Sequence, residues 1–114
     1  MALIYKIVES QAWDEAMARG LFEGAPVDLA DGFIHFSTEQ QAAETAAKHF
    51  AGRSGLLLVA CDDSAFGGQL VYEPSRGGAL FPHLYGPLPT AQALFARPLP
   101  LGADGAHDFT GLLS

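Results

Sequence analysis

Two short segments place a histidine between an aromatic residue and a hydroxyl, "GFIHFS" at residues 32–37 and "FPHLYG" at residues 81–86. Side chains of a β-strand alternate between its two faces, so the three groups of each segment share one face. They are Phe33, His35 and Ser37 in the first segment and Phe81, His83 and Tyr85 in the second. Imidazole can donate and accept hydrogen bonds and can transfer protons near neutral pH, and an aromatic ring can stack on a planar ligand. We therefore expect one pocket for a small molecule that carries a sugar, a base or a nicotinamide ring.

A carboxylate and a guanidinium stand close together in "YEPSRGG". Glu73, at the end of an expected strand, could position a ribose hydroxyl or act as a base. It could equally form a surface ion pair with Arg76, three residues later. Arg76 lies in a turn next to glycines, where it could bind a phosphate or a carboxylate, or simply be solvated. The residues alone leave these alternatives open.

Simpler interpretations of the same residues also stand. A single histidine in a strand is often a hydrogen-bonded core residue, and Ser37 could be no more than a helix cap. His35, His83 and Glu73 are suitable metal-ligand types, but no close pair such as His-x-x-x-His accompanies them, so we expect no metal. The single cysteine, Cys61, ends an apolar run and is expected to be a packed thiol. The sequence contains no nucleophile elbow, P-loop or G-x-G-x-x-G motif.

Length and composition limit the class of protein. The chain has 114 residues, 49% of them hydrophobic, which predicts one domain over residues 1–114, with a core at about 3–101 and a tail at 102–114. A net charge of -7 without any basic run predicts no DNA partner and disfavours RNA. One cysteine, no signal-peptide pattern and no membrane-length apolar run predict a cytoplasmic location and no membrane association.

The expected elements follow from periodicity and from turn residues. Strands are predicted by the β-branched or apolar runs at 3–8, 33–37, 55–61, 69–73 and 94–101, and helices at 11–19, within 37–52 and briefly from Thr90. Ser37 or Thr38 would cap the second helix, and residues 22–32 would form a loop. Pro82 makes the segment 81–86 an edge strand or a structured loop. The weakly patterned tail is expected to fray.

Strands and helices alternate only in the first half of the chain, and later strands follow one another closely. This order favours a small α+β domain with split antiparallel sheets and two main helices over a doubly wound parallel sheet.

These motifs together resemble a known family. "IYKI", Trp13, "DGFIHFS", "YEPSRGG" and "FPHLYGPL" are similar to domain of unknown function 952, a mostly bacterial family, over about residues 3–100. The resemblance implies the fold of the ADP-ribosyltransferases, which bind NAD in a cleft between two small antiparallel sheets. The same superfamily includes RNA 2'-phosphotransferases, which use NAD to remove a phosphate.

The resemblance also implies roles for individual residues. His35 is similar to the strand residue that holds the NAD ribose, with Ser37 or Thr38 as the nearby hydroxyl. Tyr72 or Tyr85 would fill the position near the nicotinamide. The third motif of the transferases is a glutamate late in the chain, and here the order departs from the pattern because Glu73 precedes His83. The departure favours NAD binding over standard ADP-ribosyl transfer.

The sequence thus predicts a protein that binds NAD or ADP-ribose, with NAD as cofactor. It would act as a small transferase or hydrolase through a cleft formed by His35, Glu73 and His83. Phe33, Ser37, Thr38, Arg76, Phe81 and Tyr85 are the expected ligand-binding residues. The alternative is a non-catalytic small-molecule-binding or sensor module that uses the same cleft.

Overall fold

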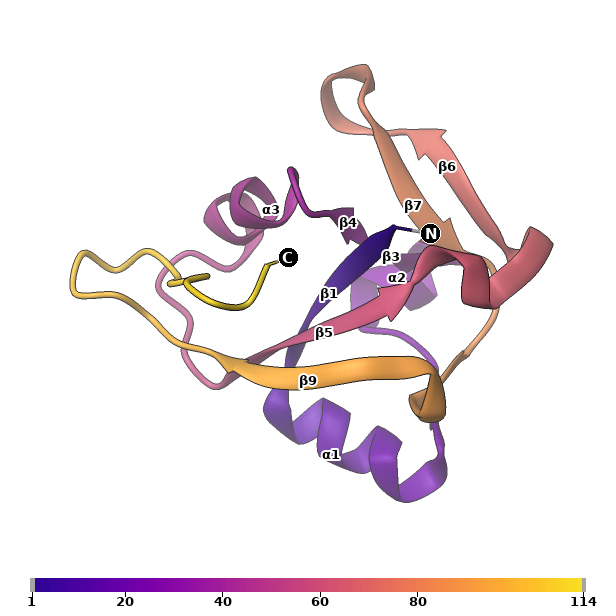
Figure 1. The fold of residues 1–114 in the computed structure, drawn as a ribbon, viewed down its shortest axis with the longest axis horizontal. Coiled ribbons are helices and arrows are strands. Elements are labelled where there is room, and N and C mark those ends of the chain that lie inside the picture. Colours follow the sequence, from indigo (N-terminus) through magenta and orange to yellow (C-terminus); the bar gives the residue numbers. More distant parts are fainter. Residues whose placement is uncertain (1, 114) are drawn as a thin grey trace.

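Strands β1 (Leu3–Glu9) and β5 (Leu56–Asp62) form the centre of the larger antiparallel sheet. The computed structural model describes residues 2–113, without the side chain of Arg76. Strands β4 (Ser37–Thr38) and β9 (Ala93–Leu99) flank the central pair, which gives the order β4-β1-β5-β9 (Figure 1). Both central strands lie where the sequence predicts strands, and they pair with each other over their full length.

A second sheet carries the two histidine segments. It has the order β3-β7-β6, from strands β3 (Ile34–His35), β7 (Leu80–Leu84) and β6 (Leu70–Pro74). The hairpin of β6 and β7 projects from the body of the molecule (Figure 1). Strands β2 (Leu21–Phe22) and β8 (Leu88–Pro89) form a separate short pair.

Three α-helices accompany the sheets in the described chain, α1 (Ser10–Arg19), α2 (Pro26–Asp31) and α3 (Ala42–His49). Helix α1 ends at Gly20, whose φ of 84° is the left-handed conformation that glycine adopts without strain. Short 3-10 helices follow at η1 (Asp63–Gln69), η2 (Arg76–Gly78) and η3 (Thr90–Gln92). The antiparallel sheets and the few helices make a small compact α+β domain, which confirms the predicted class.

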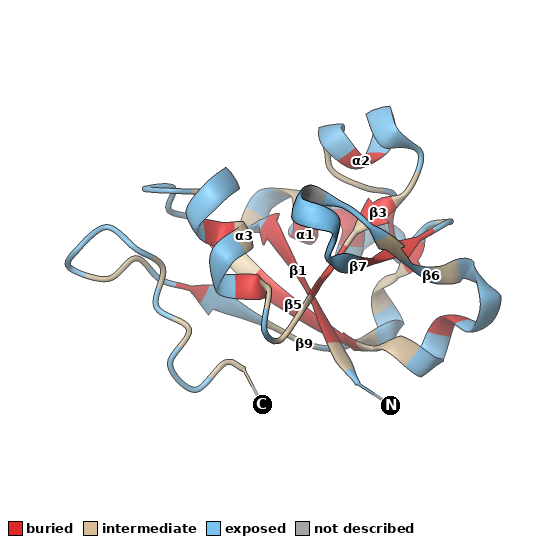
Figure 2. Ribbon diagram, turned by 90° about the horizontal axis from the view of Figure 1, so that it is seen from above, coloured by how far each residue is buried: buried red, intermediate tan, exposed pale blue. Residues whose placement is uncertain are grey.

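The two central strands of the larger sheet are mostly buried (Figure 2). Their alternating side chains enter two different cores. Ile4 and Val8 point to the core beneath α1 and the second sheet, whereas Tyr5 and Ile7 point to the core beneath α3. By this alternation Lys6 belongs to the same face as Ile4 and Val8. A lysine is thereby directed into the space between the two sheets.

The segment 22–32, predicted as a loop, instead contains the last residue of β2 and the whole of helix α2. Pro26 occupies the first helical position, where its missing N–H costs nothing. The Asp28 carboxylate accepts a hydrogen bond of 2.7 Å from the Ala25 N–H and so completes the start of the helix. The loop prediction was wrong because this local start signal lies among residues that are individually typical of turns.

The segment 33–37 is not one strand. It leaves the second sheet after His35 and joins the larger sheet at Ser37, which pairs with Tyr5. The helix that follows begins at Ala42, later than predicted. Ser37 does not cap it, because its hydroxyl bonds Thr45 Oγ1 at 2.9 Å. Just before the helix, the backbone N–H of Thr38 donates a hydrogen bond of 3.0 Å to Gln41 Oε1.

Strand β7 is the middle strand of its sheet, so the prediction of an edge strand or loop was wrong. The N–H and C=O of one strand residue point to the same side, and the Pro82 carbonyl accepts a bond of 2.9 Å from Phe36 on the β3 side. Because β3 has already ended at His35, the proline nitrogen interrupts no ladder.

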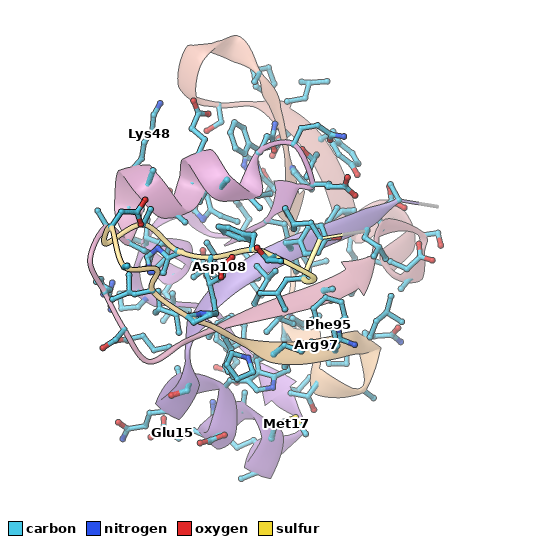
Figure 3. All side chains as sticks on the ribbon, turned by 60° about the vertical axis from the view of Figure 1, so that its left-hand side comes forward. Glu15, Met17, Lys48, Phe95, Arg97 and Asp108 are labelled. Atoms are coloured by element: carbon cyan, nitrogen blue, oxygen red, sulfur yellow. The ribbon has the colours of Figure 1, made fainter. Side chains whose placement is uncertain are left out.

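The tail from residue 102 onward is packed against the body of the protein. Phe109, Leu112 and Leu113 contact the core beneath α3, and His107 Nε2 bonds the Arg53 carbonyl oxygen at 2.7 Å. The expectation of a frayed tail was therefore wrong. On the neighbouring strand β9, the Arg97 guanidinium lies over the Phe95 ring, 4.3 Å from its centre (Figure 3). Within residues 2–113, no helix is long and apolar enough to cross a membrane.

Candidate functional site

His35 and His83 are directly opposite each other in the pairing of β3 with β7. Their ring centres are 5.4 Å apart, and the ring planes meet at 71°. Phe33 stacks on the His83 ring with the centroids 4.1 Å apart, and its ring also lies 4.6 Å from that of His35. The pleat of the second sheet thus brings together two histidines that are 48 positions apart in the chain.

Both histidines line a groove of about 690 Å³ between the two sheets, hereafter the histidine groove. Its floor includes residues Lys6 to Glu9 of β1, which border the groove because β4 pairs with β1 at Ile4 and Tyr5 alone. Helix α2 forms one wall and helix α3 another. Among the predicted site residues, Ser37 and Phe81 line it as well.

His83 is held by a carboxylate on the adjacent strand. Its Nδ1 lies 2.8 Å from Glu73 Oε1, and the Tyr85 hydroxyl donates to the same oxygen at 2.7 Å. The hydrogen bonds from Tyr85 and His83 lower the pKa of Glu73 from its ordinary value, and the carboxylate in turn raises the pKa of Tyr85. An ionised Glu73 can only accept, so the proton of the neutral imidazole is on Nδ1.

The other nitrogen of His83 has an unusual environment. His83 is 4% exposed, and its Nε2 has no hydrogen-bond partner. Among the residues that the structure describes, it is the only buried side-chain polar atom without a hydrogen-bond partner. A buried polar atom without a partner is costly, and such atoms concentrate where ligands or catalysis supply the missing bond.

His35 lies between two carboxylates of helix α2. Its Nδ1 is 2.6 Å from Asp28 Oδ1, and its Nε2 is 3.0 Å from Asp31 Oδ2. Both carboxylates therefore contact the His35 ring, and the contact of Nδ1 with Asp28 is a hydrogen bond. The two differ in burial, because the Asp28 side chain is 1% exposed and the Asp31 side chain 49%.

Lys6 completes this charged group with an Nζ atom 3.0 Å from the Asp28 carboxylate. Burial alone would raise the pKa of Asp28, but the His35 hydrogen bond, the Lys6 charge and the N–H groups of Ala25 and His35 lower it to about 2. Burial lowers the pKa of Lys6, and Asp28 opposes this only in part. Both pKa values are therefore lowered, but for different reasons: the four polar contacts of Asp28 outweigh its burial, whereas the burial of Lys6 outweighs its single carboxylate partner.

The remaining predicted residues have different positions. Thr38 lies in β4, and the Tyr72 hydroxyl donates to Asp63 Oδ2 at 2.9 Å on the opposite face from the histidines. The Arg76 side chain lies outside the described residues. Cys61 is a packed thiol, as predicted, with a pKa that burial raises to about 12. Within residues 2–113, no group of three His, Cys, Asp or Glu side chains is arranged to hold a metal ion.

Sequence reasoning missed three residues of the site, Lys6, Asp28 and Asp31. A signal was present for the first, because a lysine between Tyr5 and Ile7 interrupts an otherwise apolar strand. The signal for Asp28 was the proline two residues before it, which is typical of a helix start. Asp31 is one helical turn beyond Asp28, so recognition of the helix would have indicated both carboxylates.

Comparison with known proteins gives close relatives of one kind. The crystal structure of protein CC0527 from Caulobacter crescentus is 51% identical in sequence, with a TM-score of 0.91 over 95% of each chain. Its solution NMR structure is 50% identical, with a TM-score of 0.90 over 100% of this chain and 98% of that chain. No curated protein matches the chain. Residues 7–95 match the protein family of unknown function DUF952, and the chain therefore belongs to this family.

Proposed function

We propose that the histidine groove binds NAD or an ADP-ribose fragment, with the nicotinamide ribose next to His35 and His83. The proposal is supported by the position of the groove between two small antiparallel sheets, the arrangement in which ADP-ribosyltransferases bind NAD. It assigns the present domain an ADP-ribosyltransferase-like fold. The exposed ring of Tyr85, beside Phe33 at 5.2 Å, offers a surface on which nicotinamide can stack.

The observation that carries the proposal is the unpaired Nε2 of His83. Glu73 fixes the Nδ1 proton, so Nε2 keeps an unpaired lone pair on a residue that lines a groove of ligand size. A carboxylate that orients an imidazole in this way also stabilises the positive charge that forms when the ring takes a proton. His83 is therefore suited to accept a proton from a ribose hydroxyl or from an attacking water.

The proposed activity is that of a small transferase or hydrolase. Cleavage of the bond between nicotinamide and ribose develops positive charge on the ribose, and carboxylates near the sugar stabilise that charge. Glu73, Asp28 and Asp31 supply negative charge around the two histidines. The imidazole of His83 would take the proton of the acceptor, and His35 would hold a ribose hydroxyl.

A non-catalytic binding module is the second candidate. It is favoured by the internal pairing of His35, whose two nitrogens already have carboxylate partners and are therefore not free for proton transfer. In this case the ligand would bind without turnover. The two candidates share the groove and differ only in whether NAD is consumed.

The test combines binding with turnover. NAD, ADP-ribose and nicotinamide are titrated by calorimetry, and nicotinamide release from NAD is followed in the same samples. We expect binding of NAD or ADP-ribose by the wild type, and a loss of about tenfold in affinity for His83→Gln, as for one lost hydrogen bond in a closed site. His107→Gln is the matched control, because His107 is not part of the groove lining.

The outcomes separate the candidates. Release of nicotinamide that disappears in His83→Gln supports the enzyme, whereas binding without release supports the module. If none of the three compounds binds at millimolar concentration, the NAD proposal is wrong.

A further inference from the structure

Two of the described side chains that line the histidine groove belong to lysine or arginine, Lys6 and Arg53. They are placed very differently. The Lys6 side chain is 8% exposed, and its ammonium group is hydrogen-bonded to the Asp28 carboxylate. The Arg53 side chain is 47% exposed. Of these two cations, Arg53 is therefore the one that borders the groove and is also open to a ligand.

The guanidinium of Arg53 is held at the groove by its neighbours. The chain turns after α3 at Gly52, whose φ is 75°, and the Arg53 N–H donates to the Phe50 carbonyl oxygen at 2.9 Å. The guanidinium carbon lies 5.3 Å from the centre of the Phe50 ring, within the range of a cation–π contact. Nη2 of Arg53 donates to Glu9 Oε2 at 2.7 Å. Phe50 and Glu9 also line the groove, so both contacts keep the guanidinium at its wall.

The guanidinium has more hydrogen-bond donors than its contact with Glu9 uses. That bond takes one of the five N–H donors of Arg53. An ion pair between side chains as exposed as these two contributes little to stability, so it does not by itself account for the arrangement. A guanidinium matches the geometry of a phosphate group, which it binds through two parallel hydrogen bonds.

Strand β1 relates Arg53 to the histidines along the groove. Lys6 bonds the carboxylate of Asp28, which also bonds His35, and Glu9 bonds Arg53. Lys6 and Glu9 are three residues apart, which is about 10 Å along a strand. A ligand that contacts both places must therefore be longer than a single sugar ring, as a ribose with a diphosphate is.

We propose that Arg53 forms an anion subsite of the histidine groove and binds the phosphate or diphosphate group of a phosphorylated sugar. The inference deepens the proposed function and rests on it in placing the sugar beside the histidines. The carboxylates of Asp28, Asp31 and Glu73 contact the two histidines and would repel a phosphate next to them. The anionic part of the ligand therefore belongs at Arg53.

The experiment measures dissociation constants of pyrophosphate, NAD, ADP-ribose and D-ribose by NMR at constant ionic strength. The proteins are the wild type, Arg53→Gln, Arg53→Lys and Glu9→Gln. Arg97→Gln is the matched control, because the Arg97 guanidinium also lies over a phenylalanine ring but is outside the groove lining (Figure 3). Glu15→Gln is the control for Glu9→Gln, because it removes the same charge from an exposed position on α1.

We expect Arg53→Gln to weaken the binding of pyrophosphate and ADP-ribose about tenfold or more, as for lost charge-assisted hydrogen bonds, and to leave D-ribose unchanged. Arg53→Lys keeps the charge without the paired donors, so its affinities should lie between those of Arg53→Gln and the wild type. Glu9→Gln should tighten anion binding about two- to fivefold, because it removes the negative charge beside the guanidinium. Arg97→Gln and Glu15→Gln should match the wild type.

A measurement on the wild type keeps the test independent of how well the variants fold. The side-chain Nε–H resonance of Arg53 should shift with pyrophosphate, and that of Arg97 should not. If pyrophosphate binds in this way but NAD and ADP-ribose do not bind, the NAD proposal fails and the anion subsite stands. If ADP-ribose binds equally well to the wild type and to Arg53→Gln, the NAD proposal stands and the anion subsite is wrong. The absence of an Arg53 shift with millimolar pyrophosphate, or an equal loss of affinity in Arg53→Gln and Arg97→Gln, also overturns the inference.

Discussion

His35 and His83 are hydrogen-bonding neighbours of different carboxylates, although their rings are only 5.4 Å apart. His35 is held by Asp28 and Asp31 of helix α2, and His83 by Glu73 of strand β6. The first ring has a carboxylate close to each of its nitrogens, and the second has a buried nitrogen without a partner. Two histidines with the same local sequence context thus have different chemical environments.

Asp28 should be important for stability because it is the partner of a buried lysine. Asp28→Ala leaves the Lys6 ammonium, which is 8% exposed, without its carboxylate. Breaking a buried ion pair by removing one member costs about 3 to 5 kcal/mol of unfolding free energy. Urea unfolding measures this directly. Asp31→Ala is the matched control and should cost at most about 1 kcal/mol, because its ion pair is partly exposed. Equal losses for the two variants would contradict the role given to Asp28.

The pH dependence of stability should reflect the ionisation of the Asp28 carboxylate. The pKa of Asp28 in the folded state is lowered to about 2, below its ordinary value of 3.8. The folded state therefore binds this proton later than the unfolded state as the pH falls. The stabilisation is fully present above about pH 5 and is lost between about pH 4 and pH 2, to a total of about 2 kcal/mol.

Urea unfolding of the wild type and of Asp28→Asn between pH 6 and pH 2 tests this expectation. The difference in unfolding free energy between the two proteins should shrink as the pH falls through that window. A difference that stays constant down to pH 2 would show that Asp28 has an ordinary pKa in the folded protein.

The sequence predicted most strands correctly because their apolar patterns are strong. The run "GLLLVAC" became β5, covered on both faces, and residues 11–19 lie in α1. The alternation rule also put Phe33, His35, His83 and Tyr85 on one face, and their rings are in contact. It failed at Ser37, because the chain changes sheets at Phe36 and the alternation no longer relates the residues on either side.

The charged group around Asp28 could not be predicted from periodicity. Lys6 and Asp28 are 22 positions apart, and their contact depends on how α2 lies against β1. The tail was mistaken for a frayed end because its three apolar residues have no regular spacing. Their packing comes from the tertiary position of α3 and not from a local pattern.

The Tyr85 hydroxyl should tune the Glu73 carboxylate. Tyr85→Phe removes the first of the two side-chain hydrogen bonds that lower the pKa of Glu73, so this pKa should rise toward its ordinary value. The titration of the Glu73 carboxyl carbon by ¹³C NMR measures the change. An unchanged Glu73 midpoint would show that the Tyr85 contact does not persist in solution.

The packed tail should contribute to the stability of the core beneath α3. Leu112→Ala removes a partly buried side chain from this core and should cost about 1 to 2 kcal/mol. Thr110→Ala, at an exposed position two residues earlier, should have almost no effect. Thermal or urea unfolding of the two variants distinguishes a docked tail from a loose one, for which both changes would be neutral.

The most direct test of the proposed site is a backbone NMR titration of the wild-type protein with NAD and with ADP-ribose. If the ribose lies between His35 and His83, amide shifts should cluster at residues 33–37, 72–76 and 81–86, which carry the two rings and the carboxylate partner of His83. Residues 102–113 should be silent, and His83→Gln should weaken the shifts without changing the rest of the spectrum. Millimolar NAD and ADP-ribose that shift none of the three segments would contradict the account.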